Sequence, residues 1–408
     1  MYAMKYNKQK KQSNVGIVST RNIITNIFGM KHLHWLRRAK GSILYAFMLS
    51  IFMCCTHNTY YSVTENKTVI FPDRVDTIRG VAVYQSEGLR EFTGIESVDS
   101  FVVLFSTYRD SLIFVMSTNS DSIIGKMGQI GKAKNELIVP MRECQFEKRA
   151  NGDILMHIDD FNRQCITTFN FSASLANNHL EYVGRTPYKF SNQAEQSSFF
   201  SVSDTEYVMF QGVAWANDVR DEKTISPCVY KSSGGRYEIY PQIIGKDDFQ
   251  KAFIYNIMTK MKPDKSKMLL AHGNIGLFTI VNFDSGNTLG IHESSSYDFD
   301  YLSQLSECDK ETFFSQLKAY YTSCNVTDEY IILGRDGNHT MSVFDKLEIF
   351  QPMICLFDWS GNFIYSFVTN EEVGPIAFNT HNKCLYAIGA DNCIYKYDIA
   401  KFISTSAI

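Results

Sequence analysis

The feature that most limits the possible fold is a recurring pattern of an apolar run, a short polar turn and a second apolar run. Asp, Asn, Ser and Gly fill the turns, because they adopt turn conformations that are costly for β-branched residues. The pattern predicts antiparallel hairpins, which we interpret as the outer strand pairs of β-propeller blades. The five copies span residues 113–127, 154–169, 228–240, 277–291 and 354–367.

Shorter apolar segments lie between these hairpins and are expected to form the inner strands of the same blades. The chain also contains 30 Phe and 23 Tyr, residues that favour strands over helices. The sequence therefore predicts an all-β fold, a six-bladed β-propeller of four-stranded antiparallel blades. The expected inner segments are residues 100–106, 206–212, 267–273, 329–335 and 382–389.

The sixth blade is expected to combine the two ends of the chain. Segment 393–399 has no apolar run after it, and the strand-like segment 67–73 has no partner near it in the sequence. Pairing an N-terminal strand with the last blade removes two exposed sheet edges. We therefore expect residues 67–73 to close the propeller.

Two long gaps, residues 170–228 and 292–354, interrupt the spacing of the hairpins. The second gap contains segment 309–321, where Asp309 is expected to cap a short helix. Insertions of this kind lie on one face of a propeller. They either shape a binding surface there or are only decorated loops, and the sequence leaves both possibilities open.

The segment before the hairpins resembles an export signal. Arg37, Arg38 and Lys40 supply positive charge, and residues 43–53 form an uncharged apolar run of about eleven residues. A membrane-spanning helix needs about 20 residues, whereas a signal peptide needs an apolar run of roughly 7–15. The run therefore predicts export, and the adjacent Arg pair lacks the context of a twin-arginine signal.

The apolar run ends at two adjacent cysteines and resembles the signal of bacterial lipoproteins. Cys55 is the expected lipidation site, because it places the small Cys54 before the cleavage point, and Cys54 is the second choice. An uncleaved anchor or an ordinary signal peptide are the alternatives. Residues 56–58 carry no acidic run, which favours a lipid-anchored protein of the cell envelope, on the outer membrane and facing the periplasm.

These features divide the chain into four expected parts. Residues 1–29 are interpreted as a non-structural leader or an upstream extension of the reading frame, to be left out of fold reasoning. Residues 30–54 are the expected lipoprotein signal peptide, and residues 55–66 the tether. Residues 67–408 are the expected six-bladed β-propeller.

Charge and cysteine spacing exclude several classes of function. The net charge is −3, with no basic face or tail of the kind that binds nucleic acid. The eight cysteines beyond the signal form no C-x-x-C pair, so neither a disulfide framework nor a zinc site is predicted. Whether Cys384 and Cys393 pair across their short turn stays open. The only expected membrane contact is the lipid anchor.

Three stretches carry a resemblance to a known family. Residues 357–367 with 375–399, residues 125–137 and residues 261–271 resemble motifs of the TolB-like six-bladed β-propeller lipoproteins of Bacteroidetes. The likeness covers roughly residues 70–408. One loop departs from the pattern, with an extra residue between Gly128 and Gly131 and Lys132 where Pro is common. The resemblance implies a propeller in the cell envelope and no established activity, so no catalytic residue is transferred.

Glycines and acidic pairs were weighed as sites. Gly125, Gly128 and Gly131 lack the Lys-Ser/Thr of a P-loop and the βαβ context of a dinucleotide site, so we interpret them as a loop between blades. Glycosidases and calcium sites need converging carboxylates. The acidic residues considered were Asp159, Asp160, Asp247, Asp248, Asp284, Asp298 and Asp300, of which Asp160 and Asp284 are expected in hairpin turns.

Histidine positions predict no site either. No two are spaced like metal ligands on a helix or hairpin, and no G-x-S-x-G or recognisable Ser-His-Asp set occurs. No catalytic, metal or cofactor residue is therefore predicted, and no cofactor is expected. The histidines considered were His57, His157, His179, His272, His292, His339 and His381.

The sequence favours a recognition or scaffold module whose propeller binds a protein, a peptide or a glycan. The alternative is a hydrolase or lyase that acts on a carbohydrate or lactone at the mouth of the central tunnel. Three or more carboxylates or imidazoles clustered in the tunnel would favour the enzyme. An aromatic, weakly charged mouth would favour binding. Ligand identity and oligomeric state do not follow from the sequence.

Overall fold

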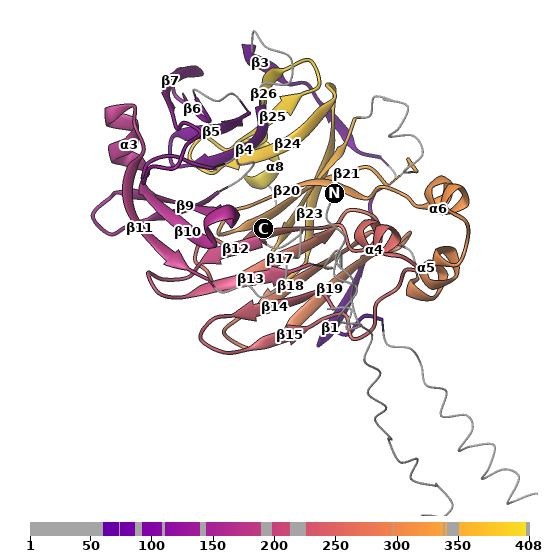
Figure 1. Cartoon of the computed structure of the whole chain (residues 1–408). Helices are drawn as coiled ribbons and strands as arrows, with labels where there is room; N and C mark the ends of the chain where they lie inside the picture. The colour runs from indigo at the N-terminus through magenta and orange to yellow at the C-terminus, as the bar shows by residue number, and fades with distance from the viewer. Residues whose placement is uncertain are drawn as a thin grey trace, which may run out of the picture. The chain divides into compact units, whose positions relative to one another are not determined.

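The computed structural model contains six β-sheets, each built on four antiparallel strands (Figure 1). The N-terminal segment of residues 1–58 is a separate unit from residues 59–408. The sheets confirm the predicted six-bladed β-propeller. The structure describes residues 60–72, 74–85, 92–107, 111–138, 144–188, 198–212, 226–296, 298–337, 339–340 and 351–404.

The first three blades are contiguous in the sequence, and their strands are numbered outward from the propeller axis. The first blade comprises β4 (Phe92–Val98), β5 (Phe101–Ser106), β6 (Ile113–Ser117) and β7 (Ser122–Met127). The second comprises β8 (Gln145–Lys148), β9 (Ile154–Asp160), β10 (Cys165–Asn170) and β11 (Glu181–Pro187). The third comprises β12 (Ser198–Ser201), β13 (Tyr207–Gln211), β14 (Cys228–Lys231) and β15 (Arg236–Glu238).

The last three blades each include one strand from residues 62–85, which precede the first blade in the sequence. The fourth blade comprises β16 (Ile257–Met261), β17 (Lys267–His272), β18 (Leu277–Asn282) and β19 (Thr288–Glu293), with β1 (Glu65–Val69) added. The fifth comprises β20 (Tyr321–Val326), β21 (Tyr330–Arg335), β22 (Met353–Asp358) and β23 (Phe363–Thr369), with β2 (Asp76–Ile78) added. The sixth comprises β24 (Val373–Asn379), β25 (Cys384–Gly389) and β26 (Cys393–Asp398), with β3 (Val81–Gln85) as its fourth strand.

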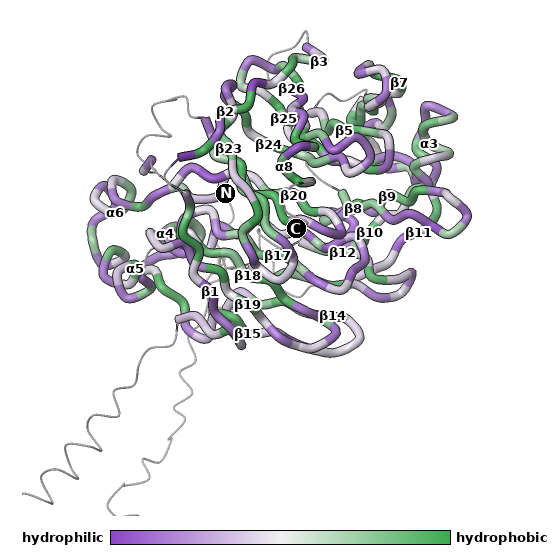
Figure 2. The backbone as a smooth tube through the Cα atoms, turned by 180° about the vertical axis from the view of Figure 1, so that it is seen from behind, coloured by the Kyte–Doolittle hydropathy of each residue, from purple (hydrophilic) through white to green (hydrophobic). Residues whose placement is uncertain are grey.

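Apolar side chains fill the space between adjacent blades. The middle strands are buried on both faces, so they are apolar along most of their length, and the turns between them are polar (Figure 2). In the packing between the first two blades, Phe105, Phe169 and Phe171 are fully buried. Burial of apolar surface stabilises a fold by about 25 cal/mol for each Å², so these interfaces are the main source of stability.

Four of the five predicted hairpins form outer strand pairs, as expected. The exception is segment 154–169, which forms the middle pair β9–β10 of the second blade. Its outer strand, β11, follows only after an inserted helix, α3 (Phe171–Asn177). The prediction was wrong because hairpin periodicity shows that two strands pair, not where the pair lies in a four-stranded sheet.

An N-terminal strand closes the propeller, but it is not the predicted one. Strand β3 pairs antiparallel with β26, with Tyr84 opposite Ile394. The expected segment 67–73 contributes to β1, which instead pairs parallel with β19 of the fourth blade. Strand β2 pairs parallel with β23 of the fifth blade. Residues 62–85, named the strap below, thus run along the rim of successive blades.

Short helices occupy the connections, and each of four begins at a capping side chain. As predicted, the Asp309 carboxylate accepts a hydrogen bond from the Thr312 N–H and caps a helix. Asn170, Asp247 and Asp298 cap helices in the same way. The remaining helical elements are η1 (Phe161–Arg163), α4 (Asp248–Ile254), α5 (Phe299–Ser306), α6 (Lys310–Gln316) and α8 (Ala400–Ser404).

Candidate functional site

A charged pair crosses the propeller axis. Glu96 lies on β4, the innermost strand of the first blade, and Lys260 lies on β16, the innermost strand of the fourth. The Lys260 Nζ is 2.5 Å from Glu96 Oε1, and the two side chains are 13% and 11% exposed. Because the first and fourth blades of six lie opposite each other, this ion pair spans the central channel.

Two more blades, the fifth and the sixth, contribute to the same cluster. The Asn325 Nδ2 on β20 donates to Glu96 Oε2 at 3.0 Å. The Asn325 Oδ1 accepts from the Phe378 backbone N–H of β24, also at 3.0 Å. Glu96, Lys260 and Asn325 therefore link the first, fourth, fifth and sixth blades through one continuous chain of polar contacts, which we name the axial cluster.

Amide side chains join neighbouring inner strands, whose edges would otherwise leave backbone groups without partners. Gln145 on β8 accepts from the Ser201 N–H at 2.8 Å and donates to the Ser201 C=O at 2.9 Å, as a strand would. Asn379 on β24 donates to Ser97 Oγ and to the Asp99 C=O. The inner strands are thus held in register around the axis.

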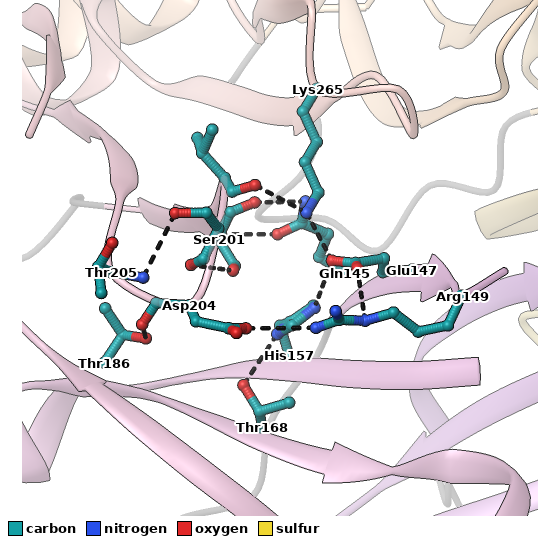
Figure 3. Close-up of polar contacts among 12 residues, drawn as sticks. Gln145, Glu147, Arg149, His157, Thr168, Thr186, Ser201, Asp204, Thr205 and Lys265 are labelled. Carbon is teal, nitrogen blue, oxygen red and sulfur yellow. Dashed lines mark hydrogen bonds and ion pairs between the residues drawn. The ribbon is translucent and has the colours of Figure 1, made fainter. Parts of the chain in front are cut away.

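A second network lies where the inner strands of the second, third and fourth blades turn into the next strands (Figure 3). The Lys265 Nζ, from the turn between β16 and β17, is 2.5 Å from Glu147 Oε2 and donates to the Val202 C=O at 2.9 Å. Arg149 pairs with Glu147 and also with Asp204. Residues from the second, third and fourth blades therefore meet here, in what we name the end network.

Electrostatics within the end network favour a charged Glu147 and a neutral His157. Burial by itself would raise the pKa of Glu147, but the ion pair with Lys265 outweighs it and holds this pKa below the usual value. Burial lowers the pKa of His157 to about 4, even though Glu147 opposes that effect. The neutral imidazole then donates from Nε2 to Glu147 and accepts from the Thr168 hydroxyl at Nδ1.

A surface pocket of about 230 Å³ lies at the rim, between the fourth and fifth blades and the strap. Two lysine ammonium groups reach it: Lys67 Nζ donates to the Ser360 C=O at 2.8 Å, and Lys267 Nζ donates to the Trp359 C=O at 3.0 Å. Glu65 is the carboxylate in its wall. The pocket is small, lined by both polar and apolar groups, and open to solvent.

The glycine segment forms a loop between blades, as predicted. Gly125 ends up in strand β7, and Gly128, at φ +83°, begins the connection to the second blade. Arg163 holds this loop through hydrogen bonds to the carbonyl groups of Gly131, Ala133 and Glu136. These three carbonyl groups of the loop are therefore bonded within the fold.

The acidic residues serve turns and helix starts. Asp160 caps η1 and pairs with Arg163, and Asp159 accepts from the Tyr188 hydroxyl. Asp247 and Asp298 are helix caps, while Asp248 and Asp300 lie in the first turns of those helices, α4 and α5. Asp284 lies in the turn between β18 and β19.

The described histidines are dispersed over several blades, and His381 lies in the turn between β24 and β25. His272 contacts the Tyr240 hydroxyl, His292 contacts Asn66, His179 contacts Asn135 and His339 contacts Asp336. Within the described ranges, no three His, Cys, Asp or Glu side chains come together in a way that could hold a metal ion.

The eight cysteines from Cys144 onward are free thiols. Cys384 lies opposite Asp398, and Cys393 lies opposite Gln85, so the two thiols do not face each other across the sheet. Cys54, Cys55, His57 and the predicted signal peptide lie outside the described residues. In the part that the structure describes, no helix is long and apolar enough to cross a membrane.

The sequence did not predict the axial cluster, the end network or the rim pocket. Glu96 and Lys260 are separated by 164 positions and share no motif. The available signal was weaker: Glu96, Lys260 and Asn325 each lie in a short strand that also contains apolar residues. Such a position predicts a buried polar residue without naming its partner.

No known protein family model matches the chain, and no curated protein matches its sequence. A solved protein from Bacteroides fragilis, described as exported, aligns with 81% of this chain and 99% of its own, at 11% identity and a TM-score of 0.50. The β-propeller domain of Cps50 (Swd1) from Myceliophteria thermophila aligns over 79% and 100%, at 10% identity and a TM-score of 0.38. The likeness to the Bacteroides protein shows a shared fold.

Proposed function

We propose that this protein is an exported binding module, tethered to the outer membrane by a lipid on Cys55 and facing the periplasm. Its propeller recognises a protein, a peptide or a glycan. Three observations support the proposal: the charged and apolar signal-like segment, the motifs similar to TolB-like propeller lipoproteins, and a fold shared with a protein described as exported. The tether supplies location, and the propeller supplies a rigid surface.

The observation that carries the binding role is the axial cluster. Glu96 and Lys260 neutralise each other, and Asn325 fixes the carboxylate in place. A general acid or base must reach the substrate and exchange a proton with it. Side chains that hold opposite blades together are poorly placed for that task, and in the end network Lys265 and Arg149 pair with the carboxylates of Glu147 and Asp204. Both networks therefore support a rigid platform over a hydrolase or lyase.

The test compares binding with turnover in the full-length, detergent-solubilised protein. The protein is incubated with envelope peptides and glycans, and with chromogenic glycosides and lactones. We expect saturable binding of at least one peptide or glycan and no release of the chromophore above the uncatalysed rate. Chromophore release that Glu96→Gln abolishes and the control Glu311→Gln, at an exposed position on α6, preserves would establish the enzyme instead.

The tether has its own test, because lipidation depends on one thiol. Cys55→Ala is expected to abolish metabolic labelling with palmitate, whereas Cys54→Ala is expected to retain it. Labelling that persists in the Cys55 variant and disappears in the Cys54 variant moves the lipid to Cys54. Labelling of both single variants together with the double variant rules out lipidation at this position.

A further inference from the structure

The rim pocket is lined by polar and apolar surface in similar amounts, which we name its wall and its floor. Ile280 and Leu289, on β18 and β19, and Trp359, between β22 and β23, supply apolar surface. Hydroxyl and amide side chains of the strap and of the turn between β18 and β19 supply most of the remaining wall. A wall of this composition suits a ligand that has both hydroxyl groups and a compact apolar face.

The two lysines give the pocket a positive charge that the fold does not cancel. Lys67 and Lys267 each donate to a backbone carbonyl, which is neutral, and an ammonium group has three N–H donors. Among the described residues, neither lysine forms an ion pair. With Glu65 as the carboxylate of the wall, two positive charges face one negative charge.

The volume of the pocket limits the size of the ligand. Sites for drug-sized molecules usually enclose about 300–1,000 Å³. The rim pocket encloses about 230 Å³, which suits one sugar-sized group rather than an extended chain. A charge-assisted hydrogen bond from each lysine would select for an anionic substituent on that group.

We propose that the rim pocket binds one acidic sugar residue, with its carboxylate between Lys67 and Lys267. This inference rests on the proposed binding role and names the class of ligand. The sugar hydroxyls contact the hydroxyl and amide side chains of the wall, and its apolar face lies against the floor. Glu65 opposes the anion and limits the affinity.

The test is calorimetric titration of the full-length protein in detergent with glucuronate, glucose and inorganic sulfate. Glucuronate is expected to bind more tightly than the other two probes. Lys67→Met and Lys267→Met keep the apolar stems and are each expected to weaken glucuronate binding by about tenfold or more. Glu65→Gln is expected to tighten it severalfold. The matched control, Lys126→Met, removes an exposed lysine on β7 and leaves the affinity unchanged.

Opposite effects at Glu65 and at the lysines separate recognition from a folding defect, since only recognition depends on the sign of the charge. Three results overturn the inference: no saturable binding of glucuronate, glucose binding as tightly as glucuronate, or unchanged affinity in both lysine variants. Sulfate binding as tightly as glucuronate reduces the pocket to a simple anion site and also overturns it. Turnover of glucuronides would instead refute the proposed binding role and leave the pocket assignment intact.

Discussion

Breaking the ion pair across the channel tests whether the axial cluster holds opposite blades together. Glu96→Gln removes the negative charge but keeps an amide oxygen that accepts from Asn325, so the nearly buried Lys260 loses its ion pair with Glu96. Lys260→Met keeps most of the side-chain volume and takes the same ion pair away from the nearly buried Glu96. Each single change therefore removes the charge opposite one nearly buried ionic group.

The expected magnitude follows from burial. Removing one partner of a buried ion pair costs about 3–5 kcal/mol, because the remaining charge has lost both water and partner. Replacing both partners costs much less, often close to nothing, since no buried charge remains. The double variant Glu96→Gln with Lys260→Met is therefore expected to be more stable than either single variant.

The assay is urea unfolding of the unaltered protein, the two single variants and the double variant, with the free energy of unfolding extrapolated to water. The matched control is Lys148→Met, which removes an ion pair with Asp99 from a site where the lysine side chain is 61% exposed. That change is expected to cost less than about 1 kcal/mol. If each axial variant costs as little as the control and the two effects simply add, the pair is screened by solvent and does not hold the blades.

Two further predictions concern the end network and a turn. Acidification from pH 6.5 to 4 is expected to lower the free energy of unfolding through His157. The pKa of His157 falls from 6.5 to about 4 on folding, so the unfolded chain binds more protons in this pH range. This contribution, up to about 3 kcal/mol, should be missing from the pH dependence of the unfolding of His157→Gln. Gly276→Ala should cost about 2–5 kcal/mol in the same measurement, because Gly276 has a φ of +71° and a Cβ there meets the Tyr320 ring at 2.5 Å. The control Gly286→Ala has a φ of +75° with open space around it, and equal losses in both variants would contradict the steric part of the argument.

Local patterns were sufficient to predict the fold class and the number of blades. A hairpin is encoded by adjacent residues, so its apolar runs and turn residues are visible in a short window of sequence. The capped helix that begins after Asp309 was predictable for the same reason. Both features depend on contacts between residues that are close in the chain.

The prediction that an N-terminal strand closes the ring is confirmed, but the strand that it named is wrong. Segment 67–73 is the most apolar part of the strap, yet Pro72 within it has no N–H to donate to a sheet. Strand β3 is only five residues long and follows Gly80, so its sequence signal is weak. Which strand reaches the last blade depends on the path of the strap around the rim, and no local pattern encodes that path.

The contacts of the candidate sites depend on distant residues and could not be predicted. Glu96 meets Lys260 only because six blades close into a ring and bring opposite inner strands face to face. The rim pocket needs the strap, the fourth blade and the fifth blade, so Lys67 and Ser360 come together from positions 293 apart. A single sequence contains these side chains but not the ring that places them.

Inner and outer contacts reinforce different parts of the ring. A propeller blade packs mainly on its two neighbours, so the ring is only as stable as its weakest interface. The end network joins the second, third and fourth blades from inside, through Lys265 and Arg149. The strap joins the third to the sixth blade from outside, beginning with the Ser62 N–H that donates to the Ile239 C=O. The third and fourth blades belong to both sets.

The rim pocket lies where the strap crosses from the fourth blade toward the fifth. Lys67 belongs to the strap and Lys267 to the fourth blade, and both donate to carbonyl groups of the fifth. An anion held between the two lysines would therefore add a link between strap and ring at the place where the chain begins to close it. Because the unfolded chain brings none of these groups together, such a ligand binds the closed ring alone and stabilises it by mass action. In this arrangement, recognition at the rim depends on β1 and closure of the propeller depends on β3, so both depend on the strap.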